Sequence, residues 1–508
     1  MTQLVLGALC SAALLAACFP KWALWYLAPL ALAPYVAVAF HRPERWRWWQ
    51  VLASAYLLGA GWYCASLWWI GYVSVAGMLA LCLFIALLLA GALTLAWWLR
   101  LKRTPLWLAL PLVWMALEAV MTYLMTGFPW MLLGYAWSAR TGLIQVADIG
   151  GVYLVSFLIV LLNVAVAEAA WCAAARAFTW SCAVPAGLAL ALAAADVAYG
   201  RAALAGADRE APRATLQIAC VQANVASDVK HDSTRDVDVL RQYRFLSLDA
   251  AQHTNDVLIW PETAMPGYYL ERGLSFRVVN DVLQRTHTPM LAGLARYELS
   301  SAGTVYFNSA GVIATNGALT SFYDKMHLVV FGEYVPLERY LPFLQKLTPI
   351  AGSFSAGTRP ALLPLSTRAG ATVACGPLIC FEDVFSCVAR AMARAGADLL
   401  VNLTNDGWYH SSPGAYQHAA LSVFRAIETR LPLVRSTNSG VTMLADRCGR
   451  ITAVLAERGS ATDISGVLYA AVPVYAPRRT FYVRHGDWFL MLCALATAAL
   501  AVRALVVR

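Results

Sequence analysis

Charged side chains are scarce in this sequence, since Asp, Glu, Lys and Arg together make up 13% of its 508 residues. Soluble globular domains carry about a quarter. Apolar residues account for 60% of the chain, and its mean hydropathy is +0.59. This shortage of charge excludes a wholly soluble globular protein and indicates that much of the chain lies in lipid.

Patterns that mark several other classes are also missing. The sequence has no internal repeat, no low-complexity tract and no basic patch interleaved with aromatic residues of the kind that binds nucleic acid. Its net charge of +9 instead suits a membrane protein, because such proteins gather Lys and Arg in their cytoplasmic loops. No cysteine spacing reads as a zinc site. We therefore expect no nucleic acid, no metal and no cofactor.

Cysteine is present, in twelve copies. Seven lie in apolar runs, where Cys behaves as a small hydrophobe, namely Cys10, Cys18, Cys64, Cys82, Cys172, Cys182 and Cys493. The other five are Cys220, Cys375, Cys380, Cys387 and Cys448. Because five is odd, at least one thiol stays unbonded unless chains pair, which favours a chemical role. A bond between Cys387 and Cys448 stays open, since connectivity cannot be deduced from sequence.

Long apolar runs fill both ends of the chain. A spanning helix needs about 20 mostly apolar residues. The sequence predicts seven spans before residue 201, at about 4–19, 23–40, 50–72, 77–99, 105–125, 152–173 and 178–200, and an eighth at about 487–507. The first run is not expected to be a removable signal peptide, because it lacks a basic n-region. Gly and Pro break the segment Gly127–Gly151 too often for it to span. This segment could form an interfacial or re-entrant element or an ordinary packed loop, and the sequence leaves both alternatives open.

Basic residues in the short loops predict the orientation. They lie between the second and third, fourth and fifth, and sixth and seventh spans, at Arg42, Arg45, Arg47, Arg100, Lys102, Arg103 and Arg176. The alternate loops hold only Lys21 and Arg140. The positive-inside rule makes the first set cytoplasmic. We therefore expect a membrane domain at 1–200, an outer, periplasmic domain at 201–486, and a last helix at 487–508.

The extramembrane segment alternates short β-rich runs with helical patterns. The predicted strands are 215–221, 257–260, 289–294, 371–380, 399–403 and 433–436, and the predicted helices are about 233–252, 275–287, 384–395 and 413–430. Strands that alternate with helices indicate a layered α/β domain.

Two reactive side chains follow predicted strands, and a third lies in an aromatic-rich loop. Glu262 comes after the strand 257–260 and Pro261, where partial burial would raise its pKa toward that of a general base. Lys325 lies among apolar residues, eight positions before Glu333, and could stabilise an oxyanion or a thiolate. Cys380 ends an apolar strand before acidic residues, as a nucleophile on a strand-to-helix turn would. Each residue also has a structural alternative. Glu262 could be a capping or surface acid, Lys325 a surface lysine that snorkels, and Cys380 a core cysteine.

Glu, Lys and Cys in this order resemble the catalytic set of the nitrilase superfamily. The motifs WPETA (260–264), YDKMHLVVFGEYVP (323–336), ICFED (379–383), NLTNDGWY (402–409) and SPGAYQH (412–418), with the predicted spans on either side, resemble its membrane-embedded branch, the apolipoprotein N-acyltransferase family. The resemblance covers the whole chain. It implies an αββα sandwich as the extramembrane domain, beside a multi-span α-helical membrane domain.

The resemblance also implies roles for individual residues. Glu262 would be the general base, Lys325 the electrostatic stabiliser and Cys380 the nucleophile, with Glu333 and Glu382 as supporting acids. Cys380 would take an acyl chain from the sn-1 position of a phospholipid, typically phosphatidylethanolamine, as a thioester. The N-terminal amine of the S-diacylglyceryl-cysteine of an apolipoprotein would then accept it, in a ping-pong reaction at the bacterial inner membrane. The remaining family motif residues, Asn405, Trp408, Gln417 and His418, are expected to pack and shape the pocket.

Aromatic and aliphatic residues in 265–270 and 332–344 suggest a lid that touches lipid, with Tyr334, Phe343 and Leu344 binding substrate. Buried loop packing is the alternative. The chain departs from the family at Val330, where Pro is usual, and at Phe381, where Tyr is common. It also has His231 after Lys230, where the family often has Trp in a position tied to substrate handling. His231 is therefore a further substrate-binding candidate.

Two other functions stay open. A membrane-tethered amidase would use the same three residues, with water as the acceptor. A transporter or scaffold would be favoured by intramembrane charges, which mark transport paths. Its candidates are Glu118, Glu168 and Asp196, but none has a basic partner at a helical spacing.

Overall fold

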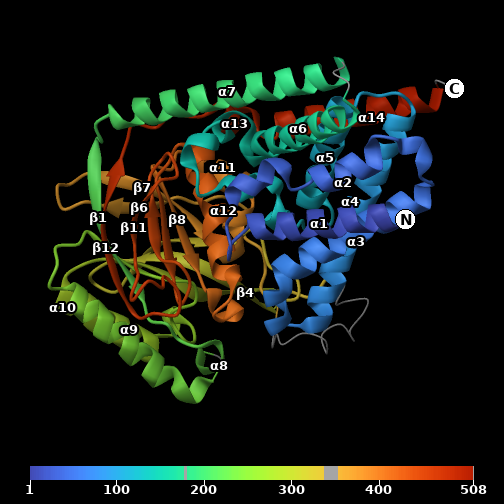
Figure 1. Ribbon diagram of the computed structural model, residues 1–508. Coiled ribbons are helices and arrows are strands. Elements are labelled where there is room, and N and C mark those ends of the chain that lie inside the picture. The colour runs from blue at the N-terminus through green and yellow to red at the C-terminus, as the bar shows by residue number, and fades with distance from the viewer. Residues whose placement is uncertain (177–179, 231, 302, 337–352, 507–508) are drawn as a thin grey trace. The chain divides into compact units, whose positions relative to one another are not determined.

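The computed structural model describes residues 1–176, 180–230, 232–301, 303–336 and 353–506 (Figure 1). These residues form two compact units. A helical unit comprises Met1–Asp208, Ser412–Phe424 and His485–Arg508, and an α/β unit comprises Arg209–Ser411 and Arg425–Arg484.

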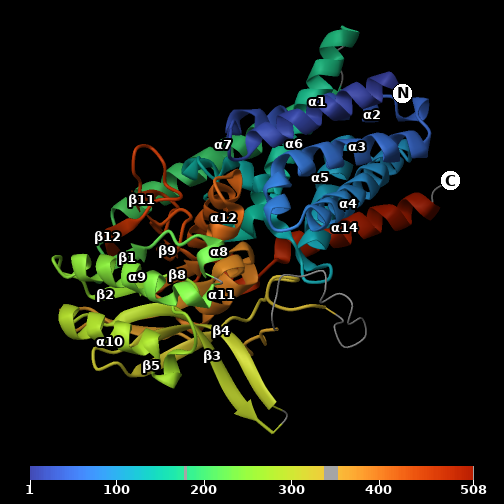
Figure 2. The same cartoon turned by 90° about the horizontal axis from the view of Figure 1, so that it is seen from below.

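The helical unit is built from apolar helices, most of them long, that lie side by side (Figure 1). They are α1 (Thr2–Cys18), α2 (Ala33–Phe40), α3 (Trp48–Leu67), α4 (Val75–Leu101), α5 (Leu106–Tyr123), α6 (Ala147–Ala175), α7 (Trp180–Asp208) and α14 (Trp488–Val506). In space α3 packs on α1 and α4, and α5 packs on α4, α6 and α14. Figure 2 shows the same helices from below.

Six helical segments in the described residues are long and apolar enough to cross a membrane. They match the third to eighth predicted spans. The first two predicted spans fall on shorter apolar helices, Thr2–Cys18 and Trp25–Phe40, so a total of eight crossings stays a prediction. One expectation was wrong, because Cys172 and Cys182 form a disulfide rather than packing as separate hydrophobes.

Most of the segment 127–151 forms three short 3-10 helices rather than a span: η4 (Pro129–Met131), η5 (Leu133–Trp137) and η6 (Thr141–Leu143). Its last residues begin α6. Residues 129–137 are buried. The main-chain N–H of Leu133 donates to Glu118 Oε1 at 3.0 Å, and that of Gly134 donates to Ser156 Oγ at 2.8 Å. A Cβ at Gly134 would lie 2.6 Å from the carbonyl oxygen of Val152, so this close approach requires glycine. These contacts are those of a packed loop.

The intramembrane acids are all buried, Glu118 at 1% exposure and both Glu168 and Asp196 at 5%. Glu168 Oε2 lies 3.7 Å from His41 Nε2 of the segment after α2. Glu118 Oε1 also accepts from Trp114 Nε1 at 3.1 Å. Both carboxyl groups therefore have partners within the helical unit.

The α/β unit contains two six-stranded sheets. The first has the order β12-β1-β2-β3-β4-β5, with β1 (Ala214–Gln222), β2 (Val257–Trp260), β3 (Met290–Ser300), β4 (Gly303–Ile313), β5 (Leu319–Asp324) and β12 (Gly466–Val474). The second has the order β11-β10-β9-β8-β7-β6, with β6 (Leu363–Ser366), β7 (Thr372–Ile379), β8 (Leu399–Thr404), β9 (Leu433–Thr437), β10 (Met443–Ala445) and β11 (Ile451–Val454).

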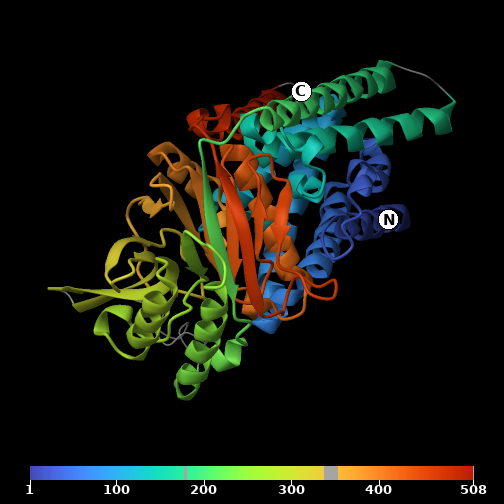
Figure 3. The same cartoon turned by 90° about the vertical axis from the view of Figure 1, so that its left-hand side faces the viewer.

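Each sheet has a parallel centre and antiparallel flanks. Strands β1, β2 and β3 run parallel, as do β7, β8 and β9. Strands β1 and β12 pair antiparallel along their whole length, and Figure 3 shows them as two long strands side by side. Strands of the two sheets also touch, as β1 and β2 do with β9, and β4 with β7. The sheets therefore pack face to face as a sandwich.

Helices cover the sheets. They are α8 (Ser227–Lys230), α9 (Asp236–Ala250), α10 (Leu274–Thr286), α11 (Ser386–Ala395) and α13 (Phe481–His485), while α12 (Pro413–Thr429) contributes to both units. Helix α10 buries Val279, Val282, Leu283 and Thr286, the spacing of one helix face. This face joins the core around Trp260 and Tyr243, and α9 and α10 lie together over the first sheet (Figure 1). The predicted layered α/β fold is confirmed.

Candidate active site

Cys380 directly follows β7 and begins the 3-10 helix η10 (Cys380–Val384). Its φ is +51°, in the left-handed region, which costs a residue with a Cβ on the order of 1–3 kcal/mol. The side-chain amide of Asn402 donates to its carbonyl oxygen at 3.0 Å. Cys380 is therefore presented on a strained turn that a neighbouring strand fixes, and the residue stays partly exposed.

Glu262 follows β2 and Pro261 and is 7% exposed. Its Oε1 accepts from Asn308 Nδ2 at 2.8 Å, and its Oε2 accepts from the main-chain N–H of Asn405 at 3.0 Å. The turn lies so close to the neighbouring strand that a Cβ at Gly293 would come within 2.6 Å of Glu262 Cα. The carboxylate is thus held from two elements, β4 and the end of β8.

Lys325 follows β5 and is 1% exposed. Its Nζ lies 2.8 Å from Glu333 Oε2 and 3.5 Å from Glu262 Oε1. Asn308 Nδ2 also donates to Glu333 Oε1 at 2.7 Å, so one amide bridges the two carboxylates. Burial opposes the charge of Lys325, but Glu333, Glu262 and Cys380 outweigh burial and raise its pKa above the usual range. Lys325 is therefore an ammonium at neutral pH.

The thiol of Cys380 responds to the charges of this group. Burial raises its pKa, and the charges of Glu262 and Asp406 raise it further, whereas the charge of Lys325 lowers it. The net shift is upward, so the resting thiol is protonated at neutral pH. Because the thiolate is the nucleophilic form, this site needs a nearby proton acceptor, and Glu262 is the carboxylate that acts on the thiol most strongly.

Glu382 is fully buried and links the segments that carry Lys325 and Cys380. Its Oε1 accepts from Tyr323 Oη and the main-chain N–H of Met326, both at 2.7 Å, and its Oε2 accepts from the N–H of Ile379 at 2.8 Å. Burial raises the pKa of Glu382 to about 7. Its contacts fix the main chain just after Lys325 and just before Cys380.

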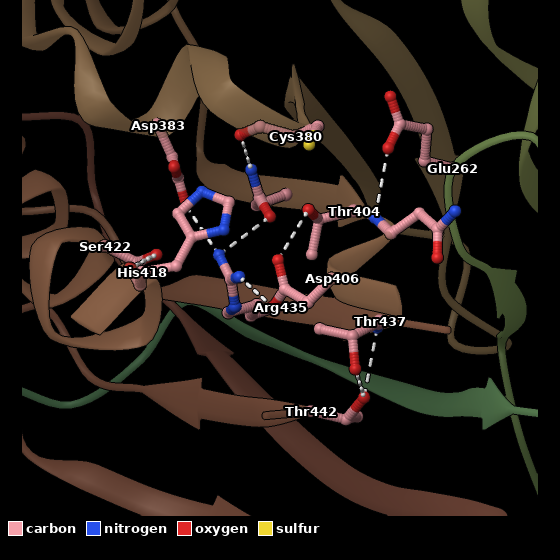
Figure 4. A network of polar contacts seen from close by, with 12 residues as sticks. Glu262, Cys380, Asp383, Thr404, Asp406, His418, Ser422, Arg435, Thr437 and Thr442 are labelled. Atoms are coloured by element: carbon pink, nitrogen blue, oxygen red, sulfur yellow. Dashed lines mark hydrogen bonds and ion pairs between the residues drawn. The ribbon is translucent and has the colours of Figure 1, made fainter. Parts of the chain in front are cut away.

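A buried ionic network lies beneath the turn at Cys380 (Figure 4). Arg435 of β9 is 0% exposed. Its guanidinium lies 2.7 Å from Asp383 Oδ2 and 2.8 Å from Asp406 Oδ2, and it donates to Asn402 Oδ1 at 3.1 Å. Because Asn402 also holds the carbonyl of Cys380, Arg435 braces the turn through two partners. Sequence reasoning missed this role, although a lone Arg in the strand LVRST was a visible signal.

The remaining predicted residues are placed as follows. The side chain of Tyr334 is half-buried, and its carbonyl accepts from the N–H of Phe331 at 2.8 Å. Trp408 is also half-buried. His231, Phe343 and Leu344 lie outside the described residues. Phe381 packs its ring 5.1 Å from that of Phe385.

Gln417 and His418 belong to the helical unit. Gln417 Oε1 accepts from Trp69 Nε1 and Trp130 Nε1, both at 3.0 Å, and the His418 ring lies 5.1 Å from that of Trp130. Asn405 does more than pack, because its main chain contacts Glu262. Within the described ranges, no group of three or more His, Cys, Asp or Glu side chains is arranged to hold a metal ion.

The chain matches two described families. Residues 11–165 match the apolipoprotein N-acyltransferase N-terminal domain, and residues 216–476 match carbon-nitrogen hydrolase. An apolipoprotein N-acyltransferase 2 from Treponema pallidum is 32% identical over 397 residues, which cover 71% of this chain and 69% of that one. The chain belongs to the apolipoprotein N-acyltransferase family of carbon-nitrogen hydrolases.

Other members of the family give the extent of the similarity. An apolipoprotein N-acyltransferase from Geobacter metallireducens is 36% identical over 360 residues, covering 71% of this chain and 66% of that one. One from Chlorobaculum tepidum is 28% identical over 520 residues, covering 98% and 96%. The first four curated relatives are matched over 54–66% of their own length.

Solved structures are more distant. A carbon-nitrogen hydrolase from Helicobacter pylori is 17% identical with a TM-score of 0.37, covering 55% of this chain and 94% of that one. An amidase from Nesterenkonia is 17% identical with a TM-score of 0.39, covering 56% and 98%.

Proposed function

We propose that this protein transfers an acyl chain from the sn-1 position of a phospholipid to the N-terminal amine of the S-diacylglyceryl-cysteine of apolipoproteins. The observation that carries the proposal is the convergence of Glu262, Lys325 and Cys380 in a member of the apolipoprotein N-acyltransferase family. Relatives that bear this name support the choice of substrates.

In the first half-reaction Glu262 accepts the thiol proton of Cys380, and the thiolate attacks the ester carbonyl. Negative charge develops on the carbonyl oxygen, where the ammonium of Lys325 and main-chain N–H groups would stabilise it. The ester C–O bond then breaks, and the proton held by Glu262 passes to the departing lysophospholipid oxygen. The acyl chain remains on the sulfur as a thioester.

In the second half-reaction the amine of the diacylglyceryl-cysteine attacks the thioester carbonyl. Glu262, again ionised, takes the amine proton and returns it to the sulfur as the C–S bond breaks. The products are an N-acylated lipoprotein and the resting thiol. A thioester suits this exchange because it reacts readily with amines and persists where water is excluded.

The supporting residues fit these roles. Glu333 pairs with Lys325 at 2.8 Å, which keeps the lysine charged in both half-reactions. Asn308 fixes Glu262 and Glu333 together, so the base is positioned before substrate binds. Tyr334, Phe343 and Leu344 would contact the lipid substrates from the segment proposed as a lid, and His231 would contact them from the segment after Lys230.

We place the protein in the bacterial inner membrane as a multi-pass enzyme. Six apolar helices support insertion, and the basic loops support a periplasmic catalytic domain. The assigned domains remain 1–200, 201–486 and 487–508. Phosphatidylethanolamine is the proposed acyl donor.

The test is mass spectrometry of the purified full chain after incubation with phosphatidylethanolamine vesicles. We expect an acyl adduct on the peptide that contains Cys380, and its loss when a synthetic diacylglyceryl-cysteine peptide is added. The variant Cys380→Ala should form no adduct, while Cys387→Ala, which alters an exposed cysteine, should behave as wild type. Release of free fatty acid without acylated peptide would instead favour a hydrolase, and absence of any adduct would overturn the proposal.

A further inference from the structure

A second lysine reaches the candidate active site. Lys230, the last residue of α8, donates from Nζ to the main-chain oxygen of Glu262 at 2.9 Å. The contact is with the backbone of the general base and not with its carboxylate. Lys230 therefore ties the turn after β2 to the segment after β1.

The groups around the nucleophile carry an excess of negative charge. The carboxylates paired with the two cations of this site, Lys325 and Arg435, belong to Glu262, Glu333, Asp383 and Asp406. Buried Glu382, with a pKa of about 7, adds a fifth carboxyl group, which accepts from the N–H just before Cys380. Both cations are already matched, Lys325 by Glu333 at 2.8 Å and Arg435 by Asp383 at 2.7 Å and Asp406 at 2.8 Å. A thiolate on Cys380 would add a further negative charge. Such a thiolate requires positive charge that no carboxylate has neutralised.

Lys230 supplies charge of this kind. It forms no ion pair with any residue of the described ranges, and its bonded partner, a carbonyl, is neutral. Its charge nonetheless interacts with those of both Glu262 and Cys380. Burial lowers the pKa of Lys230 to about 8, so the ammonium persists at neutral pH and is lost in mild alkali.

We propose that Lys230 is a positioning residue of the acyl transfer, which holds the main chain of Glu262 and electrostatically stabilises the thiolate of Cys380. This proposal rests on the proposed function only where it assigns the thiolate of Cys380 to acyl transfer. The charge effect on the thiol exists whatever the acyl donor is. Lys325 also lowers the pKa of the thiol, but its ammonium is already paired with Glu333 at 2.8 Å.

The test is the rate at which iodoacetamide alkylates Cys380 in the full-length protein between pH 6 and pH 10, followed by mass spectrometry of the Cys380 peptide. In Lys230→Met the apparent pKa of the thiol should rise by about one unit, which slows alkylation about tenfold at pH 7. Above pH 8 the ratio of the wild-type rate to the Lys230→Met rate should fall toward one, because wild-type Lys230 then loses its proton. In Lys230→Arg the guanidinium stays charged, so the rate should match wild type at pH 7, and its ratio to the Lys230→Met rate should not fall in alkali.

Two controls accompany this comparison. Arg241→Met removes a cation whose side chain is 73% exposed and should leave the Cys380 profile unchanged. The alkylation rate of Cys387, which is exposed, serves as a reference within each sample. An unchanged rate in Lys230→Met would overturn the proposal. So would a loss of the same factor at every pH that Lys230→Arg does not restore, because that loss would mean a purely structural role. A wild-type protein that shows the expected pH profile but forms no acyl adduct with phospholipid would refute the proposed function and leave the role of Lys230 intact.

Discussion

At the residue scale, one amide organises both carboxylates of the site. Asn308 donates through Nδ2 to Glu262 at 2.8 Å and to Glu333 at 2.7 Å. Two acids held so close to one lysine would otherwise repel each other and turn away. The amide is thus as much a part of the constellation as the three reactive residues.

We expect Asn308→Ala to slow formation of the acyl adduct on Cys380 by about one to two orders of magnitude, because hydrogen bonds to charged groups contribute about 1.5–3 kcal/mol. Single-turnover mass spectrometry with phosphatidylethanolamine would measure this rate. Asn316→Ala is the matched control, since Asn316 is exposed in a turn and bonds only locally among the contacts described. Equal rates for the two variants would contradict the role given to Asn308.

Glu382 gives a pH-dependent prediction about stability. Its folded-state pKa is raised from 4.5 to about 7, so the folded protein binds this proton more tightly than the unfolded chain does. The group therefore favours folding below pH 4.5, and this contribution is lost as the pH rises toward 7. Glutamine does not titrate, so the stability of Glu382→Gln should not decrease for this reason as the pH rises.

The measurement is the unfolding temperature of wild type and Glu382→Gln between pH 4.5 and pH 8. The difference between the two proteins should change steadily across pH 4.5–7 and then level off. Glu457→Gln, at a side chain 60% exposed, controls for removal of a carboxylate. A difference that does not vary with pH would be inconsistent with a buried, proton-binding Glu382.

At the scale of elements, the three reactive residues occur where strands stop. Strands β2, β5 and β7 end at Trp260, Asp324 and Ile379. Glu262 and Lys325 follow at once or after one proline, and Cys380 follows β7 directly. The turn at Cys380 is then braced by β8 and β9 through Asn402 and Arg435.

Arg435→Met should destabilise the α/β unit by about 3–5 kcal/mol, because it leaves Asp383 and Asp406 buried without their cation. Thermal unfolding followed by intrinsic fluorescence would detect the change. Arg435→Lys should fall between this variant and wild type, since one ammonium cannot match the two-sided contacts of the guanidinium. Arg458→Met, at a side chain 92% exposed, should unfold at the wild-type temperature. An Arg435→Met protein as stable as this control would exclude a bracing role.

The sequence predicted the apolar elements well and the mixed ones poorly. All six predicted strands are present as β1, β2, β3, β7, β8 and β9, and the four predicted helices as α9, α10, α11 and α12. These strands include the parallel centres of both sheets, which are buried on both faces and so read as continuous apolar runs. The missed strands, β4, β5, β6, β10, β11 and β12, pair antiparallel. Four of them, β4, β5, β6 and β11, mix polar with apolar residues, whereas β10 is only three residues long and β12 is mostly apolar. Strand β12 even contains Pro473, which an edge strand tolerates.

These misses explain what was overlooked at the site. Asn308 lies on β4, and a strand that was not predicted cannot suggest a side chain aimed at Glu262. The role of Arg435 depends on partners 29 to 52 positions away in the chain, which no local pattern brings together. Glu262, Lys325 and Cys380 were found because each stands in its own recognisable motif.

At the scale of the whole molecule, composition indicated a membrane protein, and the placement of the apolar runs indicated one large extramembrane domain. The helical unit extends to Asp208 and also includes Ser412–Phe424, beyond the predicted boundary at residue 200. That grouping could not be read from the sequence, because residues 412–424 lie in the middle of the predicted extramembrane domain. Only contacts in three dimensions assign them to the helices.

The proposed topology predicts which residues a membrane-impermeant maleimide reaches in intact spheroplasts. Cys387 is exposed in the α/β unit and should be labelled from outside. A cysteine placed by Arg45→Cys, in a loop predicted to be cytoplasmic, should be labelled only after the membrane is permeabilised. In intact spheroplasts, labelling of the second alone would reverse the orientation, and labelling of both would contradict the proposed topology.

The left-handed backbone at Cys380 has a consequence for how such a protein can change over time. Glycine would adopt that conformation with less strain, so the substitution that relaxes this turn is also one that removes the sulfur. Selection for stability and selection for catalytic activity therefore oppose each other at this position. A descendant of this protein that no longer needs the thiol could replace Cys380 with glycine and gain stability.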